Sequence, residues 1–121
     1  MAHKTILWVT ADEVSAADPV VIAFHKAGYE VVSTPSPSQA MAVLFLIRGV
    51  HAVVLDQRLA HSGTLAGSLR SLRPEVPILL LSREQVSPLP QAVDGCVSVG
   101  EGLEGLLPSL ETVLASRHHA A

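Results

Sequence analysis

Five short apolar runs, spread along the chain, constrain its fold more than any other feature of the sequence. They cover residues 5–9, 29–33, 52–55, 77–81 and 96–99. None of them has the clean alternation of apolar and polar residues that a strand with one solvated face shows. Strands covered on both faces are therefore predicted, which is typical of a parallel sheet between two layers of helices.

The segments between these runs carry helix signals. Ser36, Pro37 and Gln39 predict a helix start, with the serine as N-cap, the proline at the first helical position and the glutamine closing a capping box. Gly49 is predicted to end this helix in a left-handed conformation. A helical crossover is therefore expected between the second and third strands.

The first helix has two interpretations. Asp18 and Pro19 predict its start and Gly28 its end, whereas a helix that starts near Asp12 and kinks at Pro19 is the alternative. Further along, the sequence predicts a short helix over 65–72, a turn or loop over 84–93, and a final helix with a leucine stripe between 103 and 114. Strands that alternate with such crossovers predict a parallel sheet with right-handed connections and helices on both faces.

Composition limits the class of protein. The 121 residues are 49% hydrophobic and 16% charged, which predicts one globular domain over residues 1–121. A net charge of −3 gives no electrostatic reason to expect nucleic acid or an anionic membrane as partner. The single cysteine, Cys96, rules out an internal disulfide, and the first apolar run is too short for a signal peptide or a spanning helix. A cytoplasmic protein is expected.

Polar residues follow two of the predicted strands directly. Asp56 comes after four consecutive apolar residues, and Ser82 follows the fourth run in the same way. In an open α/β sheet, ligands and chemistry collect at the carboxyl ends of the strands. Each residue also has a purely structural interpretation: Asp56 as a carboxylate that caps nearby backbone N–H groups, and Ser82 as a turn former.

The order of these elements resembles the receiver domain of bacterial response regulators, the chemotaxis-receiver-like family of two-component signalling. The resemblance covers nearly the whole chain, and it depends on the blocks 28–32, 36–39, 52–56 and 76–82. It implies an α/β fold of the flavodoxin-like type, a three-layer sandwich with a five-stranded parallel sheet of order 2-1-3-4-5 and helices on both faces. It also implies phosphorelay signal transduction, in which Asp56 is the phospho-acceptor and Ser82 the switch hydroxyl.

The sequence departs from the family pattern at two places. The family has an acidic pair directly after the first strand to hold Mg²⁺, but here Thr10 and Ala11 follow that strand and Asp12 arrives later. The family's lysine at the end of the fifth strand is matched by Val99, which has no ammonium donor. The metal ligands implied by the resemblance are therefore Asp12, Asp56 and the backbone carbonyl of Arg58. Mg²⁺ is expected only if the domain can be phosphorylated, and no other cofactor is expected.

Three functional hypotheses remain open from the sequence. The first is a receiver-like domain with a degenerate phosphorylation site, which keeps Asp56 and has lost or displaced the acidic pair and the lysine. The second is a pseudo-receiver that is not phosphorylated and acts as a protein–protein interaction module, and the third is a small-molecule-binding α/β domain. The expected partner is a sensor histidine kinase or another signalling protein, a homodimer is a further alternative, and no enzymatic activity is expected.

Overall fold

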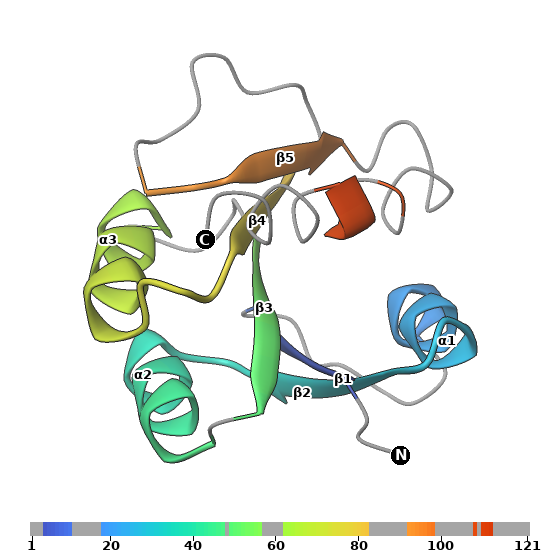
Figure 1. The fold of residues 1–121 in the computed structure, drawn as a ribbon, viewed down its shortest axis with the longest axis horizontal. Coiled ribbons are helices and arrows are strands. Elements are labelled where there is room, and N and C mark those ends of the chain that lie inside the picture. The colour runs from blue at the N-terminus through green and yellow to red at the C-terminus, as the bar shows by residue number, and fades with distance from the viewer. Residues whose placement is uncertain are drawn as a thin grey trace.

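Five strands form one parallel sheet in the order β2-β1-β3-β4-β5. A computed structural model describes residues 4–10, 18–47, 49–56, 62–82, 92–98, 108 and 110–112. The strands are β1 Lys4–Val9, β2 Tyr29–Thr34, β3 Val50–Asp56, β4 Ile78–Ser82 and β5 Gly95–Ser98 (Figure 1). The predicted sheet, its all-parallel pairing and its strand order are confirmed.

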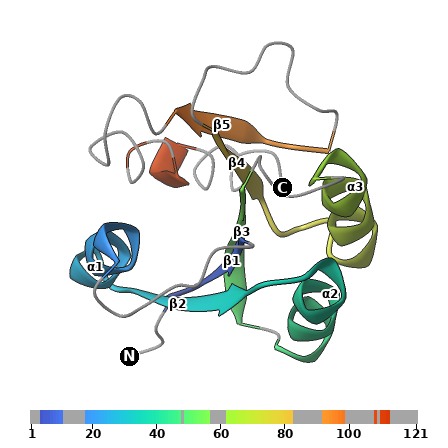
Figure 2. The ribbon, with the colours of Figure 1, turned by 180° about the vertical axis from the view of Figure 1, so that it is seen from behind.

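Helices cover both faces of this sheet. Figures 1 and 2 show α1, Pro19–Lys26, on one face, and α2, Pro37–Leu46, beside α3, Ser62–Leu72, on the other. Residues 110–112 are also helical, and Leu110 is fully buried in the same cluster as Phe24 of α1. The three-layer arrangement predicted from the sequence is therefore confirmed. No helix within the described ranges is long and apolar enough to cross a membrane.

The core consists of two clusters, one on each face of the sheet. Along β1, Ile6 and Trp8 belong to the cluster under α1, while Leu7 and Val9 belong to the cluster under α2 and α3. Successive side chains of a strand point to opposite faces, so an uninterrupted apolar run supplies both clusters. This explains why the strands lack an alternating pattern in the sequence.

The start and end of α1 follow from its flanking residues. Asp18 is the N-cap with extended backbone angles (φ −61°, ψ 131°), and its Oδ1 accepts a hydrogen bond from Val20 N at 2.9 Å. Gly28 follows the helix at φ 91°, in the left-handed region that glycine adopts without strain. The predicted helix from Pro19 to Gly28 is confirmed. The alternative, a helix that starts near Asp12 and kinks at Pro19, is wrong at its junction because Asp18 is extended; residues 11–17 lie outside the described residues.

The start of α2 was predicted correctly and its end was not. Ser36 is the N-cap, and its Oγ accepts a hydrogen bond from Gln39 N at 3.3 Å. The helix ends at Leu46, and Ile47 leaves it with extended backbone angles (φ −100°, ψ 110°). Gly49 is not in the left-handed region, since Gly28 is the one described glycine with a positive φ. The chain has therefore already left the helical conformation at Ile47, before it reaches Gly49.

The short helix predicted over 65–72 is α3, which begins earlier, at Ser62. Two other predictions lie partly outside the described residues. Most of the segment 84–93, expected to be a turn or loop, lies outside the described ranges, as does most of the predicted C-terminal stripe.

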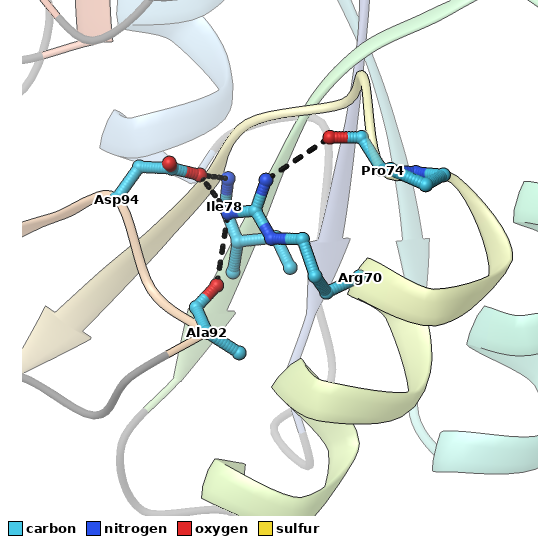
Figure 3. Close-up of polar contacts among 5 residues, drawn as sticks. All are labelled: Arg70, Pro74, Ile78, Ala92 and Asp94. Carbon is cyan, nitrogen blue, oxygen red and sulfur yellow. Dashed lines mark hydrogen bonds and ion pairs between the residues drawn. The ribbon is translucent and has the colours of Figure 1, made fainter.

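A polar network holds the amino ends of β4 and β5 together, and sequence reasoning missed it. Arg70 near the end of α3 donates to the carbonyl oxygens of Pro74 at 3.1 Å and Ala92 at 3.0 Å, and it forms an ion pair with Asp94 (Figure 3). Asp94 Oδ2 also accepts a hydrogen bond from Ile78 N at 2.8 Å. One partly buried ion pair thus links α3 to the residues that begin the last two strands.

Candidate functional site

The carboxyl ends of β1, β3 and β4 lie side by side at one edge of the sheet. Asp56 ends β3 and pairs in register with Leu81, the residue before Ser82 at the end of β4. On its other side, β3 pairs with β1 through Leu55 and Val9. The parallel register therefore brings together Thr10, Asp56 and Ser82, three polar residues that end or follow neighbouring strands.

Thr10 and Asp56 form a buried hydrogen bond at this edge. Thr10 Oγ1 donates to Asp56 Oδ2 at 3.0 Å, and the two residues are 1% and 5% exposed. The backbone N–H of Thr10 donates to the carbonyl of Thr34 at the end of β2, at 3.1 Å, which fixes the position of Thr10. A hydroxyl donor at this distance stabilises a carboxylate that is withdrawn from water.

Sequence reasoning did not predict this contact for Thr10. Thr10 was interpreted as part of the chain between β1 and a displaced Asp12. The available signal was its place directly after β1, where the receiver pattern has acidic residues. A residue at that position faces the end of β3 whatever its chemistry, because the register of two parallel strands sets the distance.

Ser82 contacts the neighbouring edge strand. Its side chain is 3% exposed, and its Oγ lies 3.3 Å from Cys96 Sγ on β5. Leu80 pairs with Cys96 in register, so the contact runs diagonally between the two strands. Cys96 itself is half-buried and packs against the cluster under α2 and α3. The hydroxyl at the end of β4 therefore has a thiol neighbour on β5.

The other residues predicted for the site, Asp12, Arg58 and Val99, lie outside the described residues. Among the residues that are described, no group of three histidine, cysteine, aspartate or glutamate side chains is placed to hold a metal ion. At this edge they supply one carboxylate, that of Asp56, and Thr10 already donates to it. Mg²⁺ takes octahedral oxygen coordination and favours carboxylates. The described residues therefore do not by themselves make up a Mg²⁺ site.

Solved structures of receiver domains have the same fold. A CheY-like receiver domain protein from Methanospirillum hungatei JF-1 superimposes with a TM-score of 0.83 at 17% identity, covering 99% of this chain and 100% of the other. Chemotaxis protein CheY4 of Vibrio cholerae gives a TM-score of 0.77 at 23% identity, covering 93% and 99%. Response regulator TrrA from Thermotoga maritima was solved in complex with Mg²⁺-BeF. It superimposes with a TM-score of 0.77 at 23% identity, covering 91% of this chain and 98% of the other.

The chain thus has the fold of a CheY-like response regulator receiver domain, as the sequence predicted. The match spans nearly the full length of both chains in each comparison. No protein-family model matches the sequence, and no curated protein matches it. Sequence identities below one quarter agree with a chain that has diverged while keeping the sheet and its order.

Proposed function

We propose that this chain, residues 1–121, is a receiver-like domain of two-component phosphorelay signalling with a degenerate phosphorylation site. The observation that supports it best is the buried hydrogen bond from Thr10 Oγ1 to Asp56 Oδ2, at 3.0 Å. It puts a carboxylate at the carboxyl end of the central strand of a receiver fold. It also puts a neutral hydroxyl where that fold's chemistry calls for acidic residues.

In this proposal Asp56 is the phospho-acceptor. One of its carboxylate oxygens attacks the phosphorus atom of a phosphohistidine or a small acyl phosphate, the bond from phosphorus to the donor breaks, and an acyl phosphate forms on Asp56. Thr10 donates to Oδ2 in the free domain, and after transfer its hydroxyl donates to an oxygen of the phosphoryl group. Positioning and neutralisation of charge supply most of the rate of such transfers. A neutral hydroxyl neutralises less charge than a metal ion, so the transfer is slow.

Ser82 is the proposed switch residue, and Cys96 is its partner in the unphosphorylated state. To reach a phosphoryl group on Asp56, the Ser82 hydroxyl leaves the thiol that lies 3.3 Å away. A thiol is a weak hydrogen-bond partner, so the loss of this one contact costs little free energy. The position of the family's lysine holds Val99, which leaves the phosphoryl group without that cation.

Mg²⁺ has a limited place in this proposal. TrrA, which shares the fold, was solved with Mg²⁺-BeF. In this chain a metal ion would need Asp12 and the backbone carbonyl of Arg58 in addition to Asp56. The proposed partner is a sensor histidine kinase or another signalling protein. The domain is proposed to be a signalling module rather than an enzyme. It is also proposed to be cytoplasmic, which agrees with its single cysteine.

A phosphorylation assay tests the proposal. The folded protein is incubated with acetyl phosphate, with and without Mg²⁺, and intact mass and two-dimensional NMR report any adduct. The expected result is a slow gain of one phosphoryl group that Asp56→Asn abolishes. In Thr10→Asp, which returns one acidic residue to the end of β1, the adduct is expected to form faster and to depend more on Mg²⁺.

The second candidate function is a pseudo-receiver that acts only through protein contacts. It is favoured by the same hydrogen bond, because Asp56 has a hydroxyl partner that needs no metal. Absence of any adduct and of any NMR shift in the folded wild-type protein would remove the phosphorelay proposal and leave this one.

A further inference from the structure

The third strand carries one extra residue where it begins to pair with the first. Thr5 of β1 pairs in register with Val50 of β3, but the next residue, Ile6, pairs with Ala52. His51 therefore has no partner on β1 in this register, which is the pattern of a β-bulge. Bulges are rare between parallel strands, and a bulge changes the direction of the side chain that it carries.

The ring of His51 contacts the backbone of β1 at this bulge. The backbone N–H of Thr5 points at Nδ1 of the ring, and the two nitrogen atoms are 3.3 Å apart. The same Nδ1 lies 2.8 Å from the carbonyl oxygen of Gly49, the residue before β3. One ring nitrogen is thus within hydrogen-bond distance of a donor and of an acceptor.

The Nδ1 atom of His51 cannot bond to both partners at the same time. Without a proton it accepts from the N–H of Thr5, but its lone pair then faces the lone pairs of the Gly49 oxygen. With a proton it donates to that oxygen, and no lone pair is left for Thr5. The proton on Nδ1 therefore selects between a contact that joins two strands and a contact within residues 49–51.

The surroundings of His51 leave this selection to the ring itself. His51 is exposed, so water can deliver the proton, and no ion pair within the described ranges involves it. The described charged or titratable side chains at the same edge of the sheet are Lys4 on β1, His25 and Lys26 on α1, Tyr29 and Glu30 on β2, Glu111, and the ion pairs Arg70–Asp94 and Arg73–Glu75. Of all these side-chain types, histidine is the one that ordinarily changes charge between pH 5 and 8.

We propose that His51 is a pH-sensitive contact between the first and third strands. When Nδ1 carries no proton, Thr5 N–H donates to it and the start of β1 is held against the bulge. As pH falls and the ring gains a proton, Nδ1 donates to Gly49, and Thr5 N–H turns to water. Asp56 lies at the other end of β3, so this contact does not depend on the proposed phosphorylation site.

NMR of the full chain, labelled with a magnetic nitrogen isotope, tests the proposal at about pH 8 and about pH 5. A hydrogen bond from one nitrogen to another transmits a scalar coupling between the two. At the higher pH a coupling between Thr5 N and His51 Nδ1 is expected, and the ring nitrogen shifts are expected to place the proton on Nε2. At the lower pH the coupling is expected to disappear.

Hydrogen exchange of the Thr5 amide gives an independent measurement. After correction for the intrinsic pH dependence of exchange, the protection of Thr5 N–H is expected to fall by roughly two- to twelve-fold from the higher to the lower pH, as for the loss of one ordinary hydrogen bond. His51→Gln, whose side chain does not titrate, is expected to abolish this change. His25→Gln, the same substitution at an exposed histidine of α1, is the matched control that keeps it.

The same measurements can overturn the proposal. A coupling from Thr5 to His51 that persists at the lower pH, or a proton on Nδ1 at both pH values, would show that no selection takes place. A change in Thr5 protection that is as large in His51→Gln as in the wild type would show that another group causes it. Circular dichroism verifies that each variant is folded.

Discussion

At the carboxyl edge of the sheet three polar side chains are buried, whereas at the amino edge two apolar side chains at the end of α2 are exposed. Thr10, Asp56 and Ser82 are at most 5% exposed, while Phe45 and Leu46 are at least 66% exposed. Both arrangements are the reverse of the usual distribution of residues in a globular protein.

The two edges differ in what stabilises such an arrangement. A buried polar group is tolerated when another group of the same chain satisfies it, as Thr10 does for Asp56. An exposed apolar group is not satisfied within the chain, and a second molecule is needed to remove it from water. The Asp56 carboxylate at the carboxyl edge therefore has a hydrogen-bond partner within the chain, whereas the exposed apolar side chains at the amino edge are left in water.

The largest expected effect separates two leucines of α2 that are two residues apart. Leu44→Ala is expected to lower the free energy of unfolding by about 2–5 kcal/mol, because Leu44 is 1% exposed and its removal leaves a cavity. Leu46→Ala is expected to change it by less than about 0.5 kcal/mol in dilute protein, because Leu46 is 74% exposed. Urea denaturation measures both. Equal effects would contradict the description of the amino edge.

The next effect tests the carboxyl edge. Thr10→Val keeps the shape of the side chain and removes the donor to a buried carboxylate. It is therefore expected to lower the free energy of unfolding by about 1.5–3 kcal/mol. Thr34→Val is the matched control at the end of β2. Thr34 Oγ1 is buried and has no hydrogen-bond partner within the described part of the chain, so this change is expected to be neutral or stabilising. Thermal denaturation of both variants compares them, and a cost for Thr34→Val as large as for Thr10→Val would refute the argument.

A smaller effect compares two ion pairs at the amino edge. Asp94→Ala removes the partner of Arg70 and the acceptor for Ile78 N. It is expected to lower the free energy of unfolding by about 1–2 kcal/mol. Glu75→Gln breaks the exposed pair with Arg73 and is expected to cost less than about 0.5 kcal/mol in dilute protein. Asp94→Asn keeps an acceptor for Ile78 N, so its cost should lie between the two. Urea denaturation would expose a wrong assignment if Glu75→Gln cost more than Asp94→Ala.

The smallest effect concerns the titration of Tyr29, the first residue of β2. Burial raises its pKa above the ordinary value of about 10, and the nearby Glu111 carboxylate raises it further. Because the folded-state pKa is raised, Tyr29 contributes stability that is fully present below its unfolded pKa and is lost as pH rises through its folded pKa. Glu111→Gln is expected to lower the Tyr29 pKa.

The chain has one tyrosine, so ultraviolet absorbance of the phenolate follows this residue alone. Glu30→Gln, on the exposed residue that follows Tyr29, is the control that leaves the titration unchanged. A Tyr29 pKa that Glu111→Gln does not move would show that the carboxylate is too distant to act.

Several parts of the fold could be predicted because local chemistry determines them. Asp18 before Pro19, Ser36 before Pro37 and a glycine at position 28 each set a helix boundary through contacts within a few residues. The prediction for Gly49 was wrong because it also used only the chemistry of neighbouring residues. A glycine near a helix end is only a local signal, and here Ile47, two residues before Gly49, already leaves the helix with extended backbone angles.

The parts of the site that were missed involve residues far apart in the sequence. Thr10 and Asp56 are separated by 46 positions, Ser82 and Cys96 by 14, and Arg70 and Asp94 by 24. No periodicity or cap signal links such residues. The register between neighbouring strands sets the separation of the first two pairs, and the position of α3 beside the start of β5 sets that of the third.

The sequence by itself determined the layers, the strand positions and the presence of polar residues where strands end, because these follow from apolar patterning and from capping within a few residues. Only the tertiary structure decided which polar side chains meet, that the Asp56 carboxylate has a hydroxyl partner, and that Phe45 and Leu46 at the end of α2 face solvent. Those outcomes depend on strand register and on the packing of one helix against the next. Both are set by the whole sheet at once rather than by any single segment.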